Sequence, residues 1–277
     1  MKLRIRYQTS YRYEEAVSFS PHIFRLFPKA DTHVRVERFL FETNGNADVQ
    51  YRRDLYDNIV AKCLYPGKSS ELRARLELDL ELQEKNAFHF VLAPHAVDLP
   101  FTYEAAERRV LEPFLQPATE NVPLPFWKLE PKSTVSALVE LNQAIHDNLA
   151  YERREEGEAR SVNETLALGR GACRDFAVLL AETLRGVGVA ARLASGYLFE
   201  SGDHEKTAEG ALHAWVEAYL PGAGWVGLDP TNGVFANHLH ITAAVGLTTE
   251  DVTPISGRYY GDRKIPSQMS VALELTA

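Results

Sequence analysis

The sequence predicts an α+β fold, in which an N-terminal antiparallel β-sandwich-like module precedes a core that packs a helix on an antiparallel sheet. Residues 1–85 alternate apolar and polar side chains with the period of half-buried strands. Residues 173–186 repeat apolar side chains at helical spacing. Residues 211–229 form two short strand-like runs joined by a Pro-Gly turn. Strands are therefore expected first, followed by a mixed unit of helix and sheet.

The clearest strand pattern lies at residues 72–82, LRARLELDLEL. Leucine or alanine occupies every even position and a charged residue every odd one, which is typical of an antiparallel strand with one buried face. We therefore expect a β-rich module over residues 1–100. Three further runs, each strand-like and two of them followed by Asn-Gly or Pro-Gly turn signals, are KLRIRY (2–7), THVRVERFLFET (32–43) and DNIVAKCLYP (57–66).

Proline dominates the segment that follows this module. Seven of the 14 prolines lie between Pro94 and Pro131. Because proline lacks an N–H and disfavours helix interiors and central strands, the sequence predicts an extended Pro-rich connector over residues 101–133. Its aromatic side chains predict that this connector docks on the rest of the protein.

A second domain, with C-terminal strands, is expected over residues 134–277. It opens with a predicted helix at about residues 134–148, for which Ser133 is a suitable N-cap. The charged run 151–160 is expected to be a solvated loop.

Cys173 begins the predicted helix 173–186. Free backbone N–H groups and the positive end of the helix dipole stabilise a thiolate there, and the Cys173 N–H is placed to donate to an oxyanion. Gly171, two residues earlier, lacks a side chain that would keep a substrate away from the backbone, so it is a candidate substrate-binding residue. A buried structural cysteine fits the same helix position, so this feature alone leaves the role of Cys173 open.

The other cysteine, Cys63, lies inside a strand-like run with no nearby histidine or glycine-rich turn. We expect it to be an ordinary thiol. No disulfide between Cys63 and Cys173 is predicted.

His213 and Asp229 supply the remaining parts of a thiol mechanism. A thiolate needs a histidine to take and return a proton, and the histidine needs a carboxylate to fix its tautomer. An antiparallel hairpin brings the two residues near each other, although counting from the turn leaves them about three residues out of register and so predicts a bulge or slip. Each residue alone fits a structural role, but Cys173, His213 and Asp229 together favour catalysis.

Three motifs surround these positions: G-x-C-x-D-F-A at 171–177, L-R-x-x-G-V-x-A-R-L-x-S-G-Y at 184–197, and H-A-W-V-E-x-Y-L-P-G-x-G-W-x-G-L-D-P-T-N-G at 213–233. Over about residues 130–235 the chain resembles the bacterial transglutaminase-like superfamily, and the β-rich part resembles the N-terminal region that accompanies it. The chain departs from the family at residues 246–254, GLTTEDVTP, where relatives commonly carry G-R-D-Y-x-D-V-x-P.

The resemblance implies a papain/transglutaminase-like catalytic core, in which the nucleophile helix packs on an antiparallel sheet. By the same resemblance, Cys173 is the nucleophile, His213 the general base and acid, and Asp229 the residue that orients the histidine. Tyr197 and Trp215 match family positions and are expected to form walls of the substrate cleft.

These residues predict a cysteine protease or amidase that passes through a thioester. Water and an amine can both accept the acyl group, so transglutaminase-type acyl transfer stays open, as do a peptide-binding module with a vestigial triad and an acyltransferase that uses a thioester donor. A peptide or protein amide is the expected substrate.

Composition limits the other classes of partner. The chain has 277 residues, 45% of them hydrophobic, and a formal net charge of −8, which disfavours nucleic acid as a partner. No run approaches the roughly 20 apolar residues of a membrane span, and the first residues lack the apolar segment of a signal peptide, so a cytoplasmic location is expected. The histidines His204, His238 and His240 show no metal-ligand spacing, so neither a metal nor a cofactor is expected.

Overall fold

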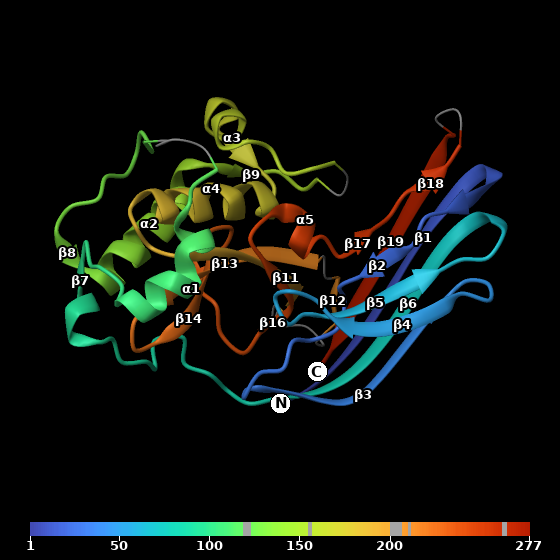
Figure 1. The fold of residues 1–277 in the computed structure, drawn as a ribbon, viewed down its shortest axis with the longest axis horizontal. Helices are drawn as coiled ribbons and strands as arrows, with labels where there is room; N and C mark the ends of the chain where they lie inside the picture. Colours follow the sequence, from blue (N-terminus) through green and yellow to red (C-terminus); the bar gives the residue numbers. More distant parts are fainter. Residues whose placement is uncertain (119–122, 155–156, 200–206, 210–211, 262–264) are drawn as a thin grey trace.

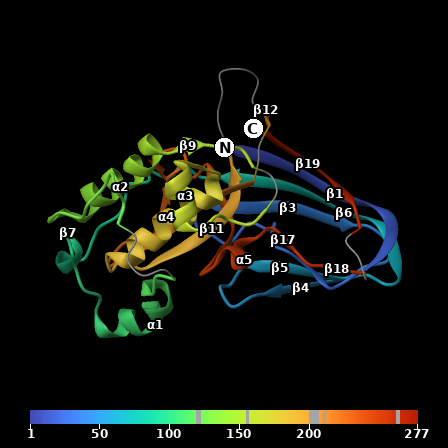
Figure 2. The ribbon, with the colours of Figure 1, turned by 90° about the horizontal axis from the view of Figure 1, so that it is seen from above.

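The structure is a computed structural model that describes residues 1–118, 123–154, 157–199, 207–209, 212–261 and 265–277. Long antiparallel strands form one side of the molecule and helices packed on a shorter sheet form the other (Figure 1). The predicted α+β fold is therefore confirmed. Figure 2 shows the same division from above, with the helices and the long strands on opposite sides.

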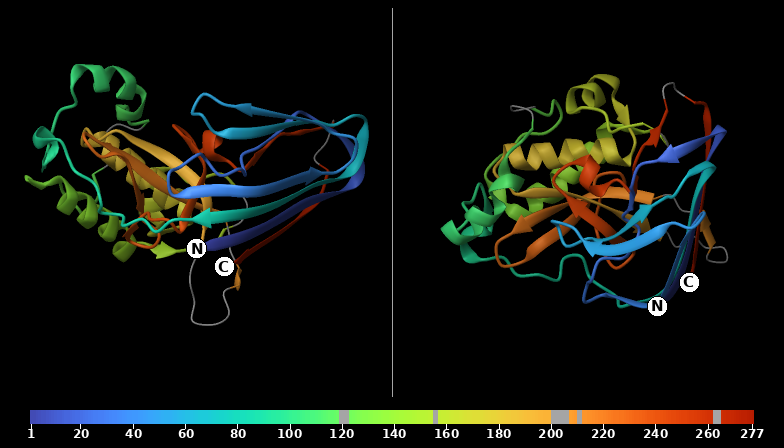
Figure 3. Two further views of the ribbon diagram at one scale, coloured as in Figure 1. Left: turned by 90° about the horizontal axis from the view of Figure 1, so that it is seen from below. Right: turned by 45° about the vertical axis from the view of Figure 1, so that its right-hand side comes forward.

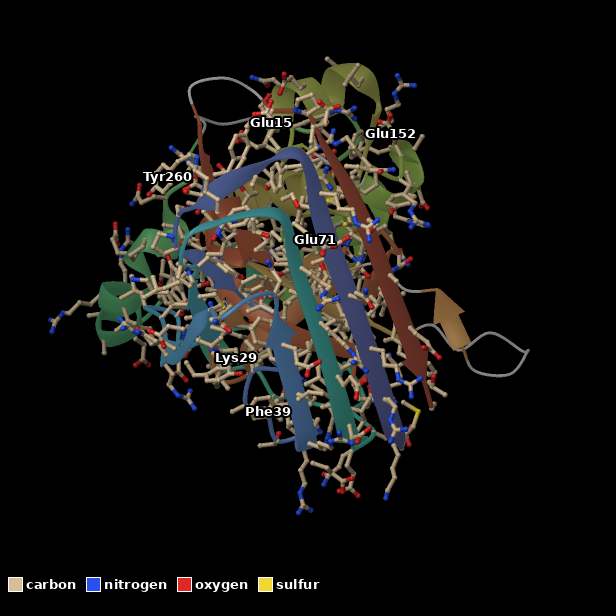
Figure 4. All side chains as sticks on the ribbon, turned by 90° about the vertical axis from the view of Figure 1, so that its right-hand side faces the viewer. Glu15, Lys29, Phe39, Glu71, Glu152 and Tyr260 are labelled. Carbon is tan, nitrogen blue, oxygen red and sulfur yellow. The ribbon has the colours of Figure 1, made fainter. Side chains whose placement is uncertain are left out.

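The N-terminal module is a sandwich of two sheets, as predicted. On β6, the six even positions of the run 72–82 are at most 3% exposed. Five of them, from Ala74 to Leu82, share a core with residues of the second sheet, and Leu72 packs in a smaller cluster with Val17 and Phe19. Figure 4 shows β3, β6, β1 and β19 side by side in the larger sheet. Its strands, in spatial order, are β12 (Thr207–Glu209), β19 (Ser267–Thr276), β1 (Lys2–Phe19), β6 (Lys68–Leu82) and β3 (Val34–Thr43), with β18 (Tyr259–Tyr260) also pairing with β1. The smaller sheet has the order β17 (Ile255–Ser256), β2 (His22–Phe24), β5 (Ile59–Leu64) and β4 (Asp48–Arg53).

The last strand, β19, returns to the first sheet and does not extend the sheet that carries His213. It pairs with β1 from Arg4↔Thr276 to Tyr13↔Ser267, which places the two termini beside each other (Figure 3). The strand pairing thus joins residues 267–276 to the N-terminal module, whereas the sequence placed them in the second domain. The division at residues 100 and 133 stays a prediction.

A helix interrupts the Pro-rich segment, so the expectation that proline density excludes helices there is wrong. Helix α1 (Ala105–Leu115) contains Pro113 within its last turn, where the missing N–H removes only one helical hydrogen bond. The expected docking is present, since the Tyr103 hydroxyl donates to the Tyr219 carbonyl at 2.8 Å. A 3₁₀ turn (Pro94–Ala96) and the short strand β7 (Asp98–Leu99) precede the predicted connector. Strand β7 pairs with β8 (Lys132–Ser133), which lies at the end of the connector.

Helix α4 (Cys173–Gly186) has Cys173 in its first turn and ends at the Gly186–Gly188 stretch, as the sequence predicted, and it packs on one face of a five-stranded sheet (Figure 1). Helix α2 (Thr134–Asn148) begins after Ser133, whose side chain accepts from the Ser136 N–H as an N-cap. The sheet has the order β15 (Val234–Phe235), β14 (Gly224–Asp229), β13 (Leu212–Leu220), β11 (Ala191–Leu198) and β16 (His240–Gly246). The remaining elements are β9 (Ala150–Tyr151), α3 (Val162–Leu168), β10 (Arg170–Gly171) and α5 (Thr249–Val252).

The N-terminal module packs against strands β11 and β16 of this sheet. Ile241 and Ala243 of β16 belong to the module's hydrophobic core, and the Lys29 N–H donates to the Thr242 carbonyl at 2.7 Å. The buried Asn58 side chain donates to the Val245 carbonyl at 2.8 Å and accepts from its N–H at 2.9 Å. The edge of the sheet that carries β16 is therefore held by residues from the first 60 positions.

Candidate active site

Cys173 is partly exposed at the first position of α4. The turn before it is closed by Asp175, a fully buried side chain whose Oδ2 accepts from the Ala172 N–H at 2.8 Å. Gly171 is buried, and a Cβ added to it would lie 2.8 Å from the Asp175 Cβ. The missing side chain at Gly171 thus permits tight packing against Asp175, which corrects its predicted role as a residue open to substrate.

Two residues of the run 151–160 also donate hydrogen bonds to the Asp175 carboxylate. Arg154 donates to Asp175 Oδ1 at 2.9 Å, and the Arg160 N–H donates to that oxygen at 2.8 Å. The expectation of a merely solvated loop over 151–160 is therefore wrong for these two arginines, whose side chains are 21% exposed. Sequence reasoning missed Asp175, although an acidic residue in the first turn of a helix is a recognisable capping signal.

His213 and Asp229 meet across neighbouring strands. The His213 Nε2 lies 2.8 Å from Asp229 Oδ2. The pairing Val216↔Leu228 continues to a position where Asp229 lies opposite Trp215, two residues along β13 from His213. Diagonal neighbours on one sheet face are within reach of long side chains, so the predicted bulge or slip is not needed, and none interrupts the pairing of β13 with β14.

The Asp229 carboxylate is fully buried and accepts hydrogen bonds on both oxygens. Oδ1 accepts from the backbone N–H groups of Thr231 and Asn232 at 3.0 and 3.3 Å. Oδ2 accepts from His213, from the Asn232 side chain at 2.8 Å, and from His240 at 3.2 Å. A buried charge that receives this many donors is compensated and held in one orientation.

The electrostatics of this pair favour the ionised forms of both side chains. Burial opposes protonation of His213, but hydrogen bonds to Asp229 and Cys173 outweigh it and raise its pKa to about 10. Burial also opposes ionisation of Asp229, and its hydrogen bonds from His213 and His240 hold the pKa of this carboxyl well below its usual range. His213 therefore carries an imidazolium at neutral pH that is hydrogen-bonded to Asp229 and close enough to the Cys173 side chain for that group to raise its pKa.

The raised pKa of His213 and the lowered pKa of Asp229 predict how the free energy of unfolding depends on pH. The unfolded histidine titrates near 6.5, so the contribution of His213 is complete below that pH and is lost as the pH rises toward about 10. The contribution of Asp229 is present above pH 3.8 and is lost as the pH falls. His213→Gln should remove the alkaline loss, which urea unfolding at about pH 6 and pH 9.5 measures. If the free energy of unfolding falls equally between about pH 6 and pH 9.5 in wild type and in His213→Gln, the raised pKa of His213 is contradicted.

Trp215 and Tyr197 do not form cleft walls, which corrects that prediction. Trp215 is 1% exposed and stacks on His213, with 6.1 Å between ring centroids and 25° between planes. It therefore supports the back of the imidazole. Tyr197 is 0% exposed in the core of the N-terminal module, and its hydroxyl donates to the Leu26 carbonyl at 2.8 Å.

Cys63 lies apart from this site in the core of the N-terminal module. It is 0% exposed on β5, and burial raises its pKa to about 11. Both cysteines are free thiols, so the structure contains no bridge between Cys63 and Cys173.

Two further residues at the site, besides Asp175, were missed by the sequence reasoning. His240 was considered only for metal spacing, yet it binds Asp229. Asn142 of α2 donates its side-chain amide to the backbone carbonyls of Asp229 and Val234, at 3.2 and 3.1 Å. The signal that could have identified Asn142 is its place on the apolar face of the predicted helix, because a buried Asn needs hydrogen-bond partners.

Within the described ranges, no group of three or more His, Cys, Asp or Glu side chains is placed to hold a metal ion. His204 lies outside the described residues. No helix in the same ranges is long and apolar enough to cross a bilayer.

Comparison with known proteins covers both parts of the chain. Residues 128–230 match the Transglutaminase-like superfamily, and residues 3–81 match the Bacterial transglutaminase-like N-terminal region. An uncharacterized protein of Mycobacterium tuberculosis is 27% identical over 281 residues, which cover 94% of this chain and 88% of that protein. An uncharacterized protein of Mycobacterium leprae is 39% identical over 109 residues, which cover 39% of this chain and only 38% of the relative.

Two further similarities concern the core and the fold. A protein-glutamine gamma-glutamyltransferase of Pseudomonas aeruginosa is 33% identical over 108 residues, or 37% of this chain and 16% of that enzyme. The crystal structure of a candidate cysteine protease from Cytophaga hutchinsonii has the same fold, with a TM-score of 0.69 at 19% identity over 99% of this chain and 90% of the other. The superfamily includes cysteine proteases and transglutaminases. The chain thus combines a core of the Transglutaminase-like superfamily, residues 128–230, with a Bacterial transglutaminase-like N-terminal region, residues 3–81.

Proposed function

We propose that this protein hydrolyses a peptide or amide bond, with Cys173 as nucleophile, His213 as general acid and base, and Asp229 as the residue that orients the histidine. The observation that supports this most is the 2.8 Å hydrogen bond of His213 Nε2 to the buried Asp229 carboxylate, on an imidazole whose pKa the neighbouring Cys173 side chain also raises. A histidine beside the thiol can take its proton and later return it. The position of Cys173 at the start of α4 adds the positive end of a helix dipole.

In the first half of the reaction, the Cys173 thiolate attacks the carbonyl carbon of the substrate. The carbonyl π electrons move to oxygen, and the Cys173 N–H donates a hydrogen bond to the resulting oxyanion. The intermediate then reforms the carbonyl and breaks the carbon–nitrogen bond. His213 gives its proton to the departing nitrogen, so an amine or ammonia leaves and a thioester remains.

In the second half, His213 is neutral and takes a proton from water as the water oxygen attacks the thioester. The carbon–sulfur bond breaks, a carboxylic acid is released, and the Cys173 thiolate and His213 imidazolium are restored. Asp229 keeps its negative charge throughout and stabilises the imidazolium in both halves.

Acyl transfer to an amine is the second candidate, because 108 residues of the chain are matched at 33% identity by a protein-glutamine gamma-glutamyltransferase. Both outcomes use the same three residues. Water is present at about 55 M, so hydrolysis is the expected result unless a bound amine occupies an attack position and water is excluded.

Product analysis tests the proposal. The full-length protein is incubated with a glutamine-containing peptide library and a labelled primary amine, and the products are identified by mass spectrometry. Hydrolysis predicts new peptide termini or deamidation without label. Incorporation of the amine would replace hydrolysis with acyl transfer. No product from any peptide, while Cys173 stays reactive toward alkylation, would contradict both and favour a binding module.

A further inference from the structure

We infer that His240 is a positioning residue for the reaction: it fixes the Asp229 carboxylate in the orientation that faces His213. This inference deepens the proposed function and rests on it. His240 lies at the start of β16, 27 positions after His213 in the chain, and it is 8% exposed. Because the His240 side chain is buried, we infer that it acts on the reaction through its hydrogen bond to Asp229 and does not bind substrate.

One oxygen of Asp229 receives three side-chain donors. Oδ2 accepts from His213 Nε2 at 2.8 Å, from Asn232 Nδ2 at 2.8 Å and from His240 Nε2 at 3.2 Å. Because a carboxylate only accepts hydrogen bonds, both histidines carry a proton on Nε2. The two imidazoles approach the same oxygen from different strands, β13 and β16, so that a rotation of the carboxyl group would break both contacts.

The other ring nitrogen of His240 is also occupied. Its Nδ1 accepts a hydrogen bond from the Asn237 N–H at 3.3 Å. One neutral tautomer, with the proton on Nε2, therefore satisfies both nitrogens of His240. His240 thus holds the carboxylate through Nε2 while Nδ1 is bound to the backbone of Asn237.

Neighbouring residues restrain both the ring of His240 and the strand β16 that carries it. Its ring packs edge-on against Trp215, with 5.5 Å between centroids, and Trp215 in turn stacks on His213. Its strand is fixed by the hydrogen bond from the Lys29 N–H to the Thr242 carbonyl. The Asn58 side chain also donates to the Val245 carbonyl and accepts from the Val245 N–H. The N-terminal module thereby fixes strand β16, and His240 on that strand orients the Asp229 carboxylate.

Removal of the His240 donor should slow the chemical steps and leave substrate binding unchanged. His240→Leu is expected to lower kcat by roughly 10–100-fold, the effect of one hydrogen bond to a buried charge, with KM within about 2-fold of wild type. His240→Gln, whose amide nitrogen corresponds to Nε2, should recover most of kcat. His240→Asn is too short to reach Oδ2 and should behave like the leucine variant, which keeps the comparison usable if His240→Leu does not fold.

The matched control is His238→Leu, because His238 lies two positions earlier and accepts only from the Lys85 N–H among the side-chain bonds described for it. Turnover and the rate of Cys173 alkylation by iodoacetamide are measured for every variant, after circular dichroism has verified folding. Equal kcat and equal alkylation in wild type, His240→Leu and His240→Asn would overturn the inference, and so would equal losses in the glutamine and asparagine variants. If wild type turns over no peptide, the proposed function fails; slower alkylation in His240→Asn that recovers in His240→Gln would still support the positioning role.

Discussion

Replacement of Cys173 by alanine is expected to reduce hydrolysis by at least about 10³-fold, because no other group at the site can form the thioester. The same change should remove labelling by iodoacetamide at neutral pH. Mass spectrometry of the alkylated protein measures both the extent and the position of the label. The fold should be retained, because Cys173 is partly exposed and the change leaves intact the hydrogen bonds of Ala172 to Asp175 and of His213 to Asp229.

Cys63→Ala is the matched control for this prediction. Cys63 is 0% exposed, and burial raises its pKa to about 11, so at neutral pH it is neither accessible nor ionised. Cys63→Ala should therefore keep full labelling and full turnover, apart from a loss of stability of about 1–2 kcal/mol from the small cavity in the core. Persistent labelling of Cys173→Ala through Cys63, or unchanged turnover, would contradict the assignment of the nucleophile.

Local patterns were enough to predict the strands and the start of the nucleophile helix. The alternation over 72–82 became the buried and exposed faces of β6, and the glycines before Cys173 marked the boundary of α4. On β13, Ala214, Val216, Ala218 and Leu220 pack toward α4, as the alternation predicts. Leu212, at the end of the strand, packs in the N-terminal core, because that module covers this end of the sheet.

Contacts between distant segments were not predictable in the same way. The cleft-wall role for Tyr197 failed because the N-terminal module covers its side of the sheet, which no local pattern reveals. His240 was missed because its importance depends on the pairing of β11 with β16, which brings residues 27 positions apart to one carboxylate. The return of β19 to β1 likewise joins the two ends of the chain, and its exposed, weakly alternating face gives no sign of its partner.

Replacement of Asp229 by asparagine should have the second largest effect, a fall in kcat of roughly 10²–10⁴-fold. Asn232 donates to Oδ2, as do both histidines, so an amide nitrogen in that place would face three donors. If the amide turns so that its oxygen meets the histidines, its nitrogen instead faces the N–H groups of Thr231 and Asn232. Either orientation leaves buried donors unpaired and removes the negative charge that keeps His213 protonated.

The test therefore includes the ionisation of His213 as well as turnover. In Asp229→Asn the pKa of His213 should fall from about 10 toward the ordinary histidine range, which NMR titration of the imidazole measures. Alkylation of Cys173 at pH 7 should slow in parallel, because the carboxylate no longer holds the neighbouring imidazole in place for proton exchange with the thiol. Asp98→Asn, at an exposed position on β7, is the matched control and should leave all three readouts unchanged. A variant Asp229→Asn that folds and retains both the raised pKa of His213 and wild-type turnover would show that the buried carboxylate serves only the fold, and the role assigned to His240 would then lose its basis.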